Sequence, residues 1–150
     1  MTETKKYAKK LNIIDNVIVA DSLRNQVIHN NTLGYAFEVC LDYYRGQFLT
    51  VIDEFQITID GEVVPTETIK FCINGKEFNP IEFEHCYSEF WQAIEPATIN
   101  VFKPGGLKAG EHNVELHLIF RSPYMPIGSN HEYMAIDNCG KRTLSLVEEE

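Results

Sequence analysis

The sequence predicts an all-β protein, an antiparallel β-sandwich with little helix, and two observations carry this prediction. First, hydrophobic and polar residues alternate along several short runs, which is the pattern of strands with one face in a core. Second, the runs are separated by dipeptides such as Asp60-Gly61 and Asn74-Gly75, which favour tight hairpin turns. No long stretch has helical periodicity, so two sheets packed face to face are the expected architecture.

The strands are expected in this order: residues 35–41, 55–59, 71–73, a strand that ends near residue 102, and residues 113–120. Asp60-Gly61 would join the second of these to Val63-Val64, and Asn74-Gly75 would join the third to Phe78. The side chains expected to face the core are Tyr35, Phe37, Val39, Leu41, Phe55, Ile57, Ile59, Val114, Leu116, Leu118 and Phe120.

Two further segments have turn or helix signals. Residues 104–110 contain Pro104-Gly105-Gly106 and Ala109-Gly110, which predict a long turn before the last strand. Residues 79–93 lack clean alternation, and Asn79-Pro80 favours a short helical turn with Asn79 as its cap and Pro80 at its first position.

Size and charge limit the classes of function. A chain of 150 residues predicts one domain, residues 1–150, with residues 1–11 as a flexible N-terminal tail. A formal net charge of −9 repels phosphate backbones, so no nucleic acid partner is expected. No apolar stretch is long enough for a membrane span, and none resembles a signal peptide. Four scattered cysteines without a CxxC pair favour free thiols and a cytoplasmic location.

The sequence contains no self-sufficient catalytic motif. His112 and His117 are five residues apart, so on one strand they would point to opposite faces and could not share a metal. Glu115 and His117 would share a face, either as part of a polar site or as ordinary surface. No nucleophile elbow and no phosphate-binding glycine loop is present. We therefore expect no catalytic, cofactor-binding or metal-binding residue in this chain.

Aromatic and basic residues instead gather where two strands end. These residues are Tyr43, Tyr44, Arg45 and Gly46 after the first strand, and Arg121, Tyr124, Met125 and Pro126 after the last. Tyr, Arg and Met are enriched in the centres of protein interfaces. The two clusters therefore predict a partner interface or the mouth of a substrate site; the alternative is two loops that pack on their own aromatic side chains.

Several segments together resemble the β (small) subunits of bacterial C-glycoside deglycosidases. The resemblance covers residues 12–147 and rests on five segments: 41–46, 57–65, 102–107, 110–112 and 121–126. It implies a β-sandwich subunit bound to a larger α subunit, a sugar-isomerase-like TIM barrel that holds a divalent metal, commonly Mn²⁺. A higher hetero-oligomer is also implied. The family resemblance supplies no catalytic residue for this subunit.

The implied reaction cleaves the C–C bond between a 3-oxo-sugar and a flavonoid-like aglycone. The 3-oxo group acidifies the proton at C2, so that elimination can expel the aromatic carbon. Metal coordination would stabilise the enolate. This chain would support that chemistry, and it would be inactive alone.

Two other functions remain open at this stage. A stand-alone carbohydrate-binding or other ligand-binding sandwich could use Trp91, Tyr87, Tyr43 and Tyr44 to stack on sugar rings. An independent enzyme whose site has no recognisable motif is the second alternative.

Overall fold

The structure, a computed structural model, describes residues 17–41, 46–93, 95–127 and 132–147, and of residues 123–127 and 132–133 it describes only the backbone. The expected N-terminal tail, residues 1–11, lies outside the described residues. So do Tyr43, Tyr44 and Arg45. For Tyr124, Met125 and Pro126, the structure gives the strand in which they lie but not the position of their side chains.

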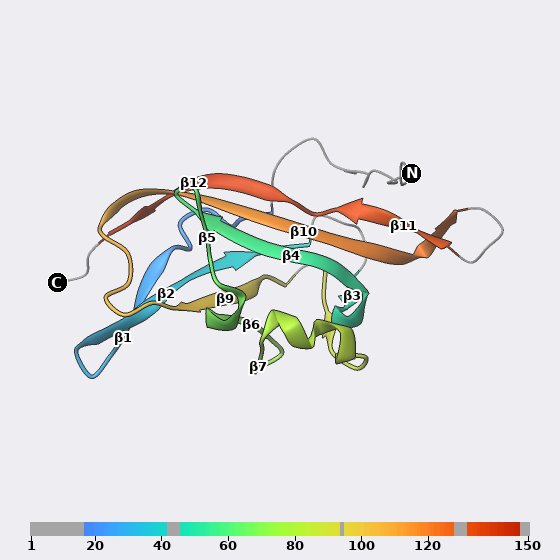
Figure 1. Cartoon of the computed structure of the whole chain (residues 1–150), viewed down its shortest axis with the longest axis horizontal. Helices are drawn as coiled ribbons and strands as arrows, with labels where there is room; N and C mark the ends of the chain where they lie inside the picture. The colour runs from blue at the N-terminus through green and yellow to red at the C-terminus, as the bar shows by residue number, and fades with distance from the viewer. Residues whose placement is uncertain (1–16, 42–45, 94, 128–131, 148–150) are drawn as a thin grey trace.

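Two antiparallel sheets lie one over the other (Figure 1), which confirms the predicted all-β fold. One sheet has the order β1-β2-β9-β6-β7, with strands Arg24–Ile28, Asn31–Val39, Ala97–Phe102, Ile69–Ile73 and Lys76–Phe78. The other has the order β11-β10-β4-β5, with strands Glu132–Asp137, Gly110–Ile127, Ile52–Ile59 and Glu62–Val63; β12, Gly140–Leu146, also pairs with β10. Strands β3, Gln47–Phe48, and β8, Phe90–Trp91, form a small third sheet.

Helix is limited, among the described residues, to three short 3₁₀ turns: η1 at Leu49–Val51, η2 at Thr66–Thr68 and η3 at Pro80–His85. The last is the turn predicted after Asn79-Pro80. The Asn79 side chain accepts a hydrogen bond from the Ile81 N–H, and Glu82 accepts one from the Asn79 N–H, which is a complete capping box. No helix in the described ranges is long and apolar enough to cross a membrane.

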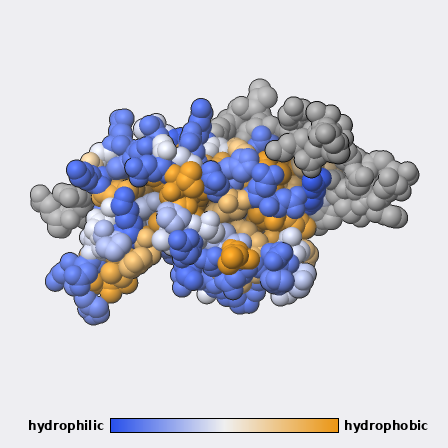
Figure 2. Space-filling model, in the orientation of Figure 1, coloured by the Kyte–Doolittle hydropathy of each residue, from blue (hydrophilic) through white to orange (hydrophobic). Residues whose placement is uncertain are grey.

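Alternation places the core as the sequence predicts. In β10, Val114, Leu116, Leu118 and Phe120 are each 2% exposed or less, whereas Glu115 and His117 are exposed. Tyr35, Phe37 and Val39 of β2 meet them from the opposite sheet and are equally buried. On the molecular face in Figure 2, hydrophilic residues predominate and are interrupted by hydrophobic patches.

Both predicted hairpin turns are present. Asp60 and Gly61 have φ angles of 50° and 85°, and Asn74 and Gly75 have φ angles of 54° and 73°. Two successive positive φ values are the requirement of the two-residue hairpin turn that matches strand twist, which explains why Asx-Gly occupies both positions. The first turn joins β4 to β5 and the second joins β6 to β7.

The segment after η3 covers one end of the core. Trp91 is 1% exposed and its indole N–H donates to the Glu95 carbonyl at 2.8 Å. A ring this buried cannot stack on a sugar, so the interpretation of Trp91 as a carbohydrate platform is wrong. The physical reason is that Trp91 packs edge-on against Phe71, with ring centroids 5.1 Å apart. Tyr87, by contrast, is 68% exposed.

His112 fixes the turn between β4 and β5 from the neighbouring strand. Its Nδ1 lies 2.6 Å from Asp60 Oδ2, and its Nε2 lies 2.6 Å from the Lys108 carbonyl oxygen. Both partners can only accept, so both ring nitrogens donate when His112 is protonated. Burial alone would lower the pKa of His112, but the hydrogen bonds to Lys108 and Asp60 outweigh it and raise that pKa. The hydrogen bond from His112 lowers the pKa of Asp60.

This pair predicts a pH optimum of stability. Asp60 contributes stability above its ordinary pKa of 3.8, and this contribution is lost as pH falls through its lowered value. His112 contributes fully below its ordinary pKa of 6.5, and its contribution is lost as pH rises through its raised value. The pair therefore stabilises most between these two ordinary values. We expect urea-unfolding midpoints of the His112→Asn variant to decline less above this window than those of the native chain.

His85→Asn is the matched control for the pH experiment. The His85 side chain is 72% exposed, so its removal should leave the pH profile unchanged. An identical pH profile for the native chain and His112→Asn would contradict the assigned role of His112.

Candidate functional site

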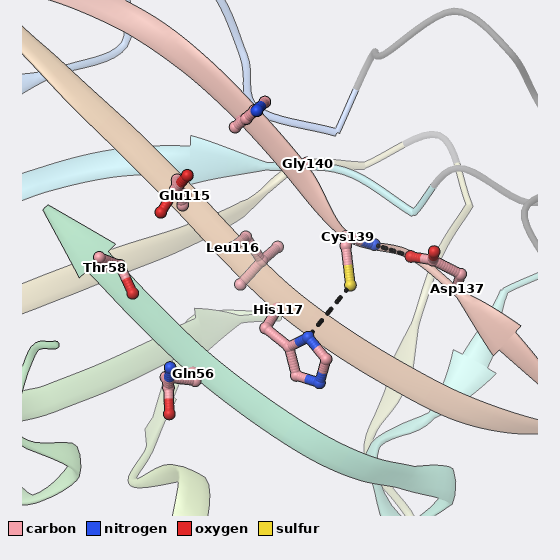
Figure 3. Close-up of a pocket in the computed structure, with 9 residues that line it drawn as sticks. Gln56, Thr58, Glu115, Leu116, His117, Asp137, Cys139 and Gly140 are labelled. Carbon is pink, nitrogen blue, oxygen red and sulfur yellow. Dashed lines mark hydrogen bonds between the residues drawn. The ribbon is translucent and has the colours of Figure 1, made fainter. Parts of the chain in front are cut away.

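A polar pocket of about 450 Å³ lies on the outer face of the β10 sheet (Figure 3). Glu115 and His117 occupy alternate positions of β10, so both point away from the core and line the pocket, as the sequence predicted for a shared face. On the adjacent strand β4, Thr58 pairs with Glu115 and Gln56 pairs with His117. The floor of the pocket is thus built by two strands in fixed register.

The opposite wall comes from a break between two strands that share one edge of β10. β11 ends at Asp137 and β12 begins at Gly140, so Asn138 and Cys139 connect them beside His117 and Leu118. Asn138 is fully buried, and its side-chain amide donates to the Cys40 carbonyl at 3.2 Å. Cys139 turns the other way, toward the pocket (Figure 3). The break therefore places a thiol on the outer face.

His117 joins this thiol to an acid on the other side of β10. Its Nδ1 lies 3.4 Å from Cys139 Sγ, and its Nε2 lies 2.9 Å from Glu54 Oε1 on β4. Because a carboxylate only accepts, Nε2 carries the proton in the neutral ring, and Nδ1 then accepts from the thiol. Cys139, in the connection between β11 and β12, His117 on β10 and Glu54 on β4 thus form a hydrogen-bonded thiol–imidazole–carboxylate triad.

This triad of side chains has part of the arrangement needed for a nucleophilic cysteine. The imidazole is placed to take the thiol proton, and the carboxylate holds the imidazole in the required tautomer. An acyl-transfer site also needs N–H donors for a developing oxyanion. The Cys139 N–H is already donated to Asp137 Oδ1 at 2.8 Å. The side chains of His117 and Glu54 are about half exposed, 49% and 53%, so water reaches the site freely. The geometry supports proton exchange at a polar surface better than covalent catalysis.

Metal binding has no support in the part of the chain that the structure describes, since no three His, Cys, Asp or Glu side chains converge there. His117 shows why, because its two nitrogens face different partners on opposite sides of the ring. That the isolated chain binds no metal stays a prediction.

Arg121 continues the same outer face toward the end of β10. Its Nε donates to Asp53 Oδ2 at 2.7 Å, and the two side chains are 48% and 41% exposed. A half-exposed ion pair adds little to stability, typically about 0–1 kcal/mol, but it fixes the direction of the guanidinium group. Arg121 is thus positioned beside the site, because its partner Asp53 directly precedes Glu54, the acid that binds His117, in β4.

Gly46, another predicted site residue, is buried against β8. A Cβ atom at this position would lie 2.5 Å from the Phe90 ring and 2.6 Å from the Trp91 carbonyl oxygen, so only glycine fits. Leu41 is also buried, which fixes both flanks of the undescribed segment 42–45. The Asn138–Cys40 hydrogen bond places Cys40, which precedes that segment, at the break between β11 and β12.

Sequence reasoning missed Cys139 and Glu54. They are 22 and 63 residues from His117 along the chain, so no local spacing could join them to it. For Glu54 a signal existed: the alternation expected over residues 55–59, extended back by one residue, would place Glu54 on the same face as Gln56 and Thr58. Cys139 had no such signal, because its direction depends on the break between two strands.

Comparison with known proteins gives a consistent result. The sequence profile of a family described as the C-glycoside deglycosidase beta subunit matches residues 13–124. A C-glycoside deglycosidase beta subunit from Eubacterium cellulosolvens is 37% identical over 62% of this chain and 63% of its own length. A 3'-dehydrocarminate deglycosidase beta subunit from a Microbacterium species is 30% identical over 81% of this chain and 87% of its own. The profile match includes Glu54, His117 and Arg121, whereas Cys139 lies beyond it.

Proposed function

The chain belongs to the C-glycoside deglycosidase beta subunit family, and from this premise we propose that it is the small subunit of a heteromeric enzyme that cleaves the C–C bond between a 3-oxo-sugar and a flavonoid-like aglycone. The observation that carries the proposal is the profile match across residues 13–124, which spans strands of both large sheets. A beta subunit has a partner subunit. We propose a metal-dependent TIM barrel for that partner, in a cytoplasmic hetero-oligomer.

The proposed division of labour follows from the chemistry of the reaction. Loss of the acidified C2 proton and protonation of the aromatic carbon both need acid–base groups held at the sugar. In the partner, a bound divalent metal, for which Mn²⁺ is our proposal, would supply Lewis-acid stabilisation of the enolate. The His117 site is too open to water to exclude solvent from such a reaction by itself. We therefore assign this chain a supporting role, with no catalytic residue of its own.

We propose that the interface with the partner includes the second half of β10, around Arg121, together with the segment between Leu41 and Gly46. Its residues would be Tyr43, Tyr44, Arg45, Gly46, Arg121, Tyr124, Met125 and Pro126. Arg121 supports this location because its guanidinium is half exposed and already oriented by Asp53. An oriented arginine loses little entropy when it binds a second carboxylate, here one on the partner.

Co-expression tests the proposed function. We expect this chain and a metal-binding TIM-barrel subunit from the same operon to co-purify. The pair, and neither subunit alone, should release the aglycone from a 3-oxo C-glucoside of a flavone, as measured by chromatography. Elemental analysis should find Mn²⁺ in the complex and not in the isolated chain.

Two results would contradict the proposal. Aglycone release by this chain alone would show that it carries the chemistry itself. Failure of the two purified subunits to associate, with both shown to be folded, would remove the supporting role.

A further inference from the structure

A second cavity, of about 500 Å³, lies at the end of the sandwich where β10 begins, between the two sheets. Tyr35 and Val101, paired across β2 and β9, belong to one wall. Ile59 at the end of β4 and Val63 on β5 belong to the other. This volume lies within the range of sites for small organic ligands, which are about 300–1,000 Å³. The cavity shares no lining residue with the His117 pocket.

The walls of this cavity are apolar and include two exposed hydrophobic side chains. Val63 is 58% exposed and Phe102 is 59% exposed, and they come from opposite sheets. Val64, Pro65, Pro104 and Leu107 complete the apolar lining. Exposed apolar side chains that converge on one cavity are typical of a binding site, whereas single ones are ordinary. A sugar, with hydroxyls on every side, would find few partners on these walls.

The polar group that stands out in the cavity is the Tyr35 hydroxyl. Tyr35 is 2% exposed, yet its hydroxyl has no hydrogen-bond partner among the described residues. Buried hydroxyls are normally paired. In the described ranges, the only side-chain atoms that are both closed to solvent and without a hydrogen-bond partner belong to Gln47. The Tyr35 hydroxyl also lacks a partner, so it is not fully closed to solvent. Because Tyr35 lines the cavity, its hydroxyl is within reach of a ligand there. Burial, followed by the nearby Asp60 carboxylate, raises the pKa of Tyr35 to about 12, so the hydroxyl stays protonated as a donor.

The rim of the cavity has mixed charge. Asp60 is held by His112 and by the Asn113 N–H, Glu62 is exposed, and Lys103 forms no ion pair among the described residues. Carboxylates at the rim accept hydrogen bonds from ligand hydroxyls, and the Lys103 ammonium donates to ligand oxygens. The charges do not favour a strongly anionic ligand, because two acids lie beside one lysine.

We propose that this cavity binds a planar, hydroxylated aromatic molecule, with its ring between the Val63 and Phe102 walls and one of its oxygens accepting from Tyr35. A flat ring system fits two apolar walls that come from facing sheets, and a single inner donor matches one carbonyl or phenol oxygen. Hydroxyls at the outer edge of the ligand would face Asp60, Glu62 and Lys103. If the proposed function holds, the aglycone that the complex releases belongs to this class; the binding itself does not depend on it.

Binding of apigenin, a hydroxylated flavone, to the purified full-length chain tests the proposal by isothermal titration or equilibrium dialysis. We expect one saturable site with a dissociation constant on the order of 10 µM, as a ligand of this size reaches in a preformed apolar pocket. Tyr35→Phe should weaken binding about fivefold through the lost hydrogen bond. Val63→Asp should weaken it roughly tenfold or more, because it puts a charge into an apolar wall.

Val27→Asp is the matched control, since Val27 is also 58% exposed but lies on β1, away from the cavity lining. It should bind apigenin as the native chain does. No saturable binding by the native chain, or equal loss of affinity in Val27→Asp and Val63→Asp, would overturn the proposal. Saturable binding of glucose in place of apigenin would also overturn it and would favour a carbohydrate module.

Failure of this proposal and failure of the proposed function are separable. Apigenin binding is measured on this chain without any partner, whereas aglycone release needs the co-purified complex. If the complex releases aglycone but the small subunit does not bind apigenin, only the proposed binding in the cavity is contradicted. If the chain binds apigenin but forms no active deglycosidase complex, only the proposed function is contradicted.

Discussion

Phe71→Ala is expected to lower the free energy of unfolding by about 3–5 kcal/mol, the usual cost of removing a buried phenylalanine ring. Phe71 is 0% exposed and its ring packs edge-on against Phe83 and Trp91, with centroids 5.2 and 5.1 Å away. It also contacts Phe55 from the facing sheet at 6.0 Å. The ring therefore links both sheets to the segment that covers the end of the core, and its loss leaves a cavity that no single neighbour can fill.

Trp91 provides the measurement for this substitution. It is the only tryptophan in the protein, it is buried, and it touches Phe71, so its fluorescence reports unfolding directly. Tyr87→Ala is the control, because Tyr87 is 68% exposed and its loss should change stability by no more than about 0.5 kcal/mol. Since domains of this size are stable by about 5–15 kcal/mol, Phe71→Ala should bring the chain close to unfolding. Equal urea midpoints for the two variants would contradict this account of the core.

The predicted parts of the fold are those set by neighbours in sequence. Alternation along Val114–Phe120 identified the inward face of β10, because each side chain reverses direction from the one before it. Asp60-Gly61 and Asn74-Gly75 identified two hairpins, because positive φ at two successive residues excludes most other pairs. Asn79-Pro80 identified η3, because a capping side chain followed by proline at the first position favours the start of a helical turn. Each of these patterns depends only on residues that lie close together in the sequence.

The features that were not predicted depend on register between distant strands. Cys139 meets His117 because β11 and β12 share one edge of β10 and break beside it, and no residue type announces that break. His112 reaches Asp60 across 52 residues for the same reason. The second cavity combines Tyr35 of β2, Val63 of β5 and Phe102 of β9, which are far apart in the sequence and come from two different sheets. Tyr35 was correctly expected in the core, but its unpaired hydroxyl could not be seen without its surroundings.

The proposed interface with the partner gives the second large expected effect. Arg45→Ala or Tyr44→Ala should weaken association with the partner subunit by about 2 kcal/mol or more, which is roughly a thirtyfold rise in the dissociation constant. These residues lie outside the described part of the structure, but both flanks of their segment are fixed, by buried Leu41 and by Gly46 against β8. Tyrosine and arginine are the residue types that most often dominate the binding energy of an interface.

Analytical ultracentrifugation of the two subunits would give the dissociation constant, with aglycone release measured on the same mixtures. Activity should fall because the complex dissociates, so an excess of the variant subunit should partly restore it. Lys108→Ala, which removes an exposed cation near the start of β10 at the opposite end of that strand, should leave association unchanged. If Arg45→Ala associates normally but turnover collapses, residues 42–45 line the substrate site, and their assignment to the partner interface is wrong. If association and turnover both stay normal, the aromatic cluster packs within its own chain, and the partner must bind another surface.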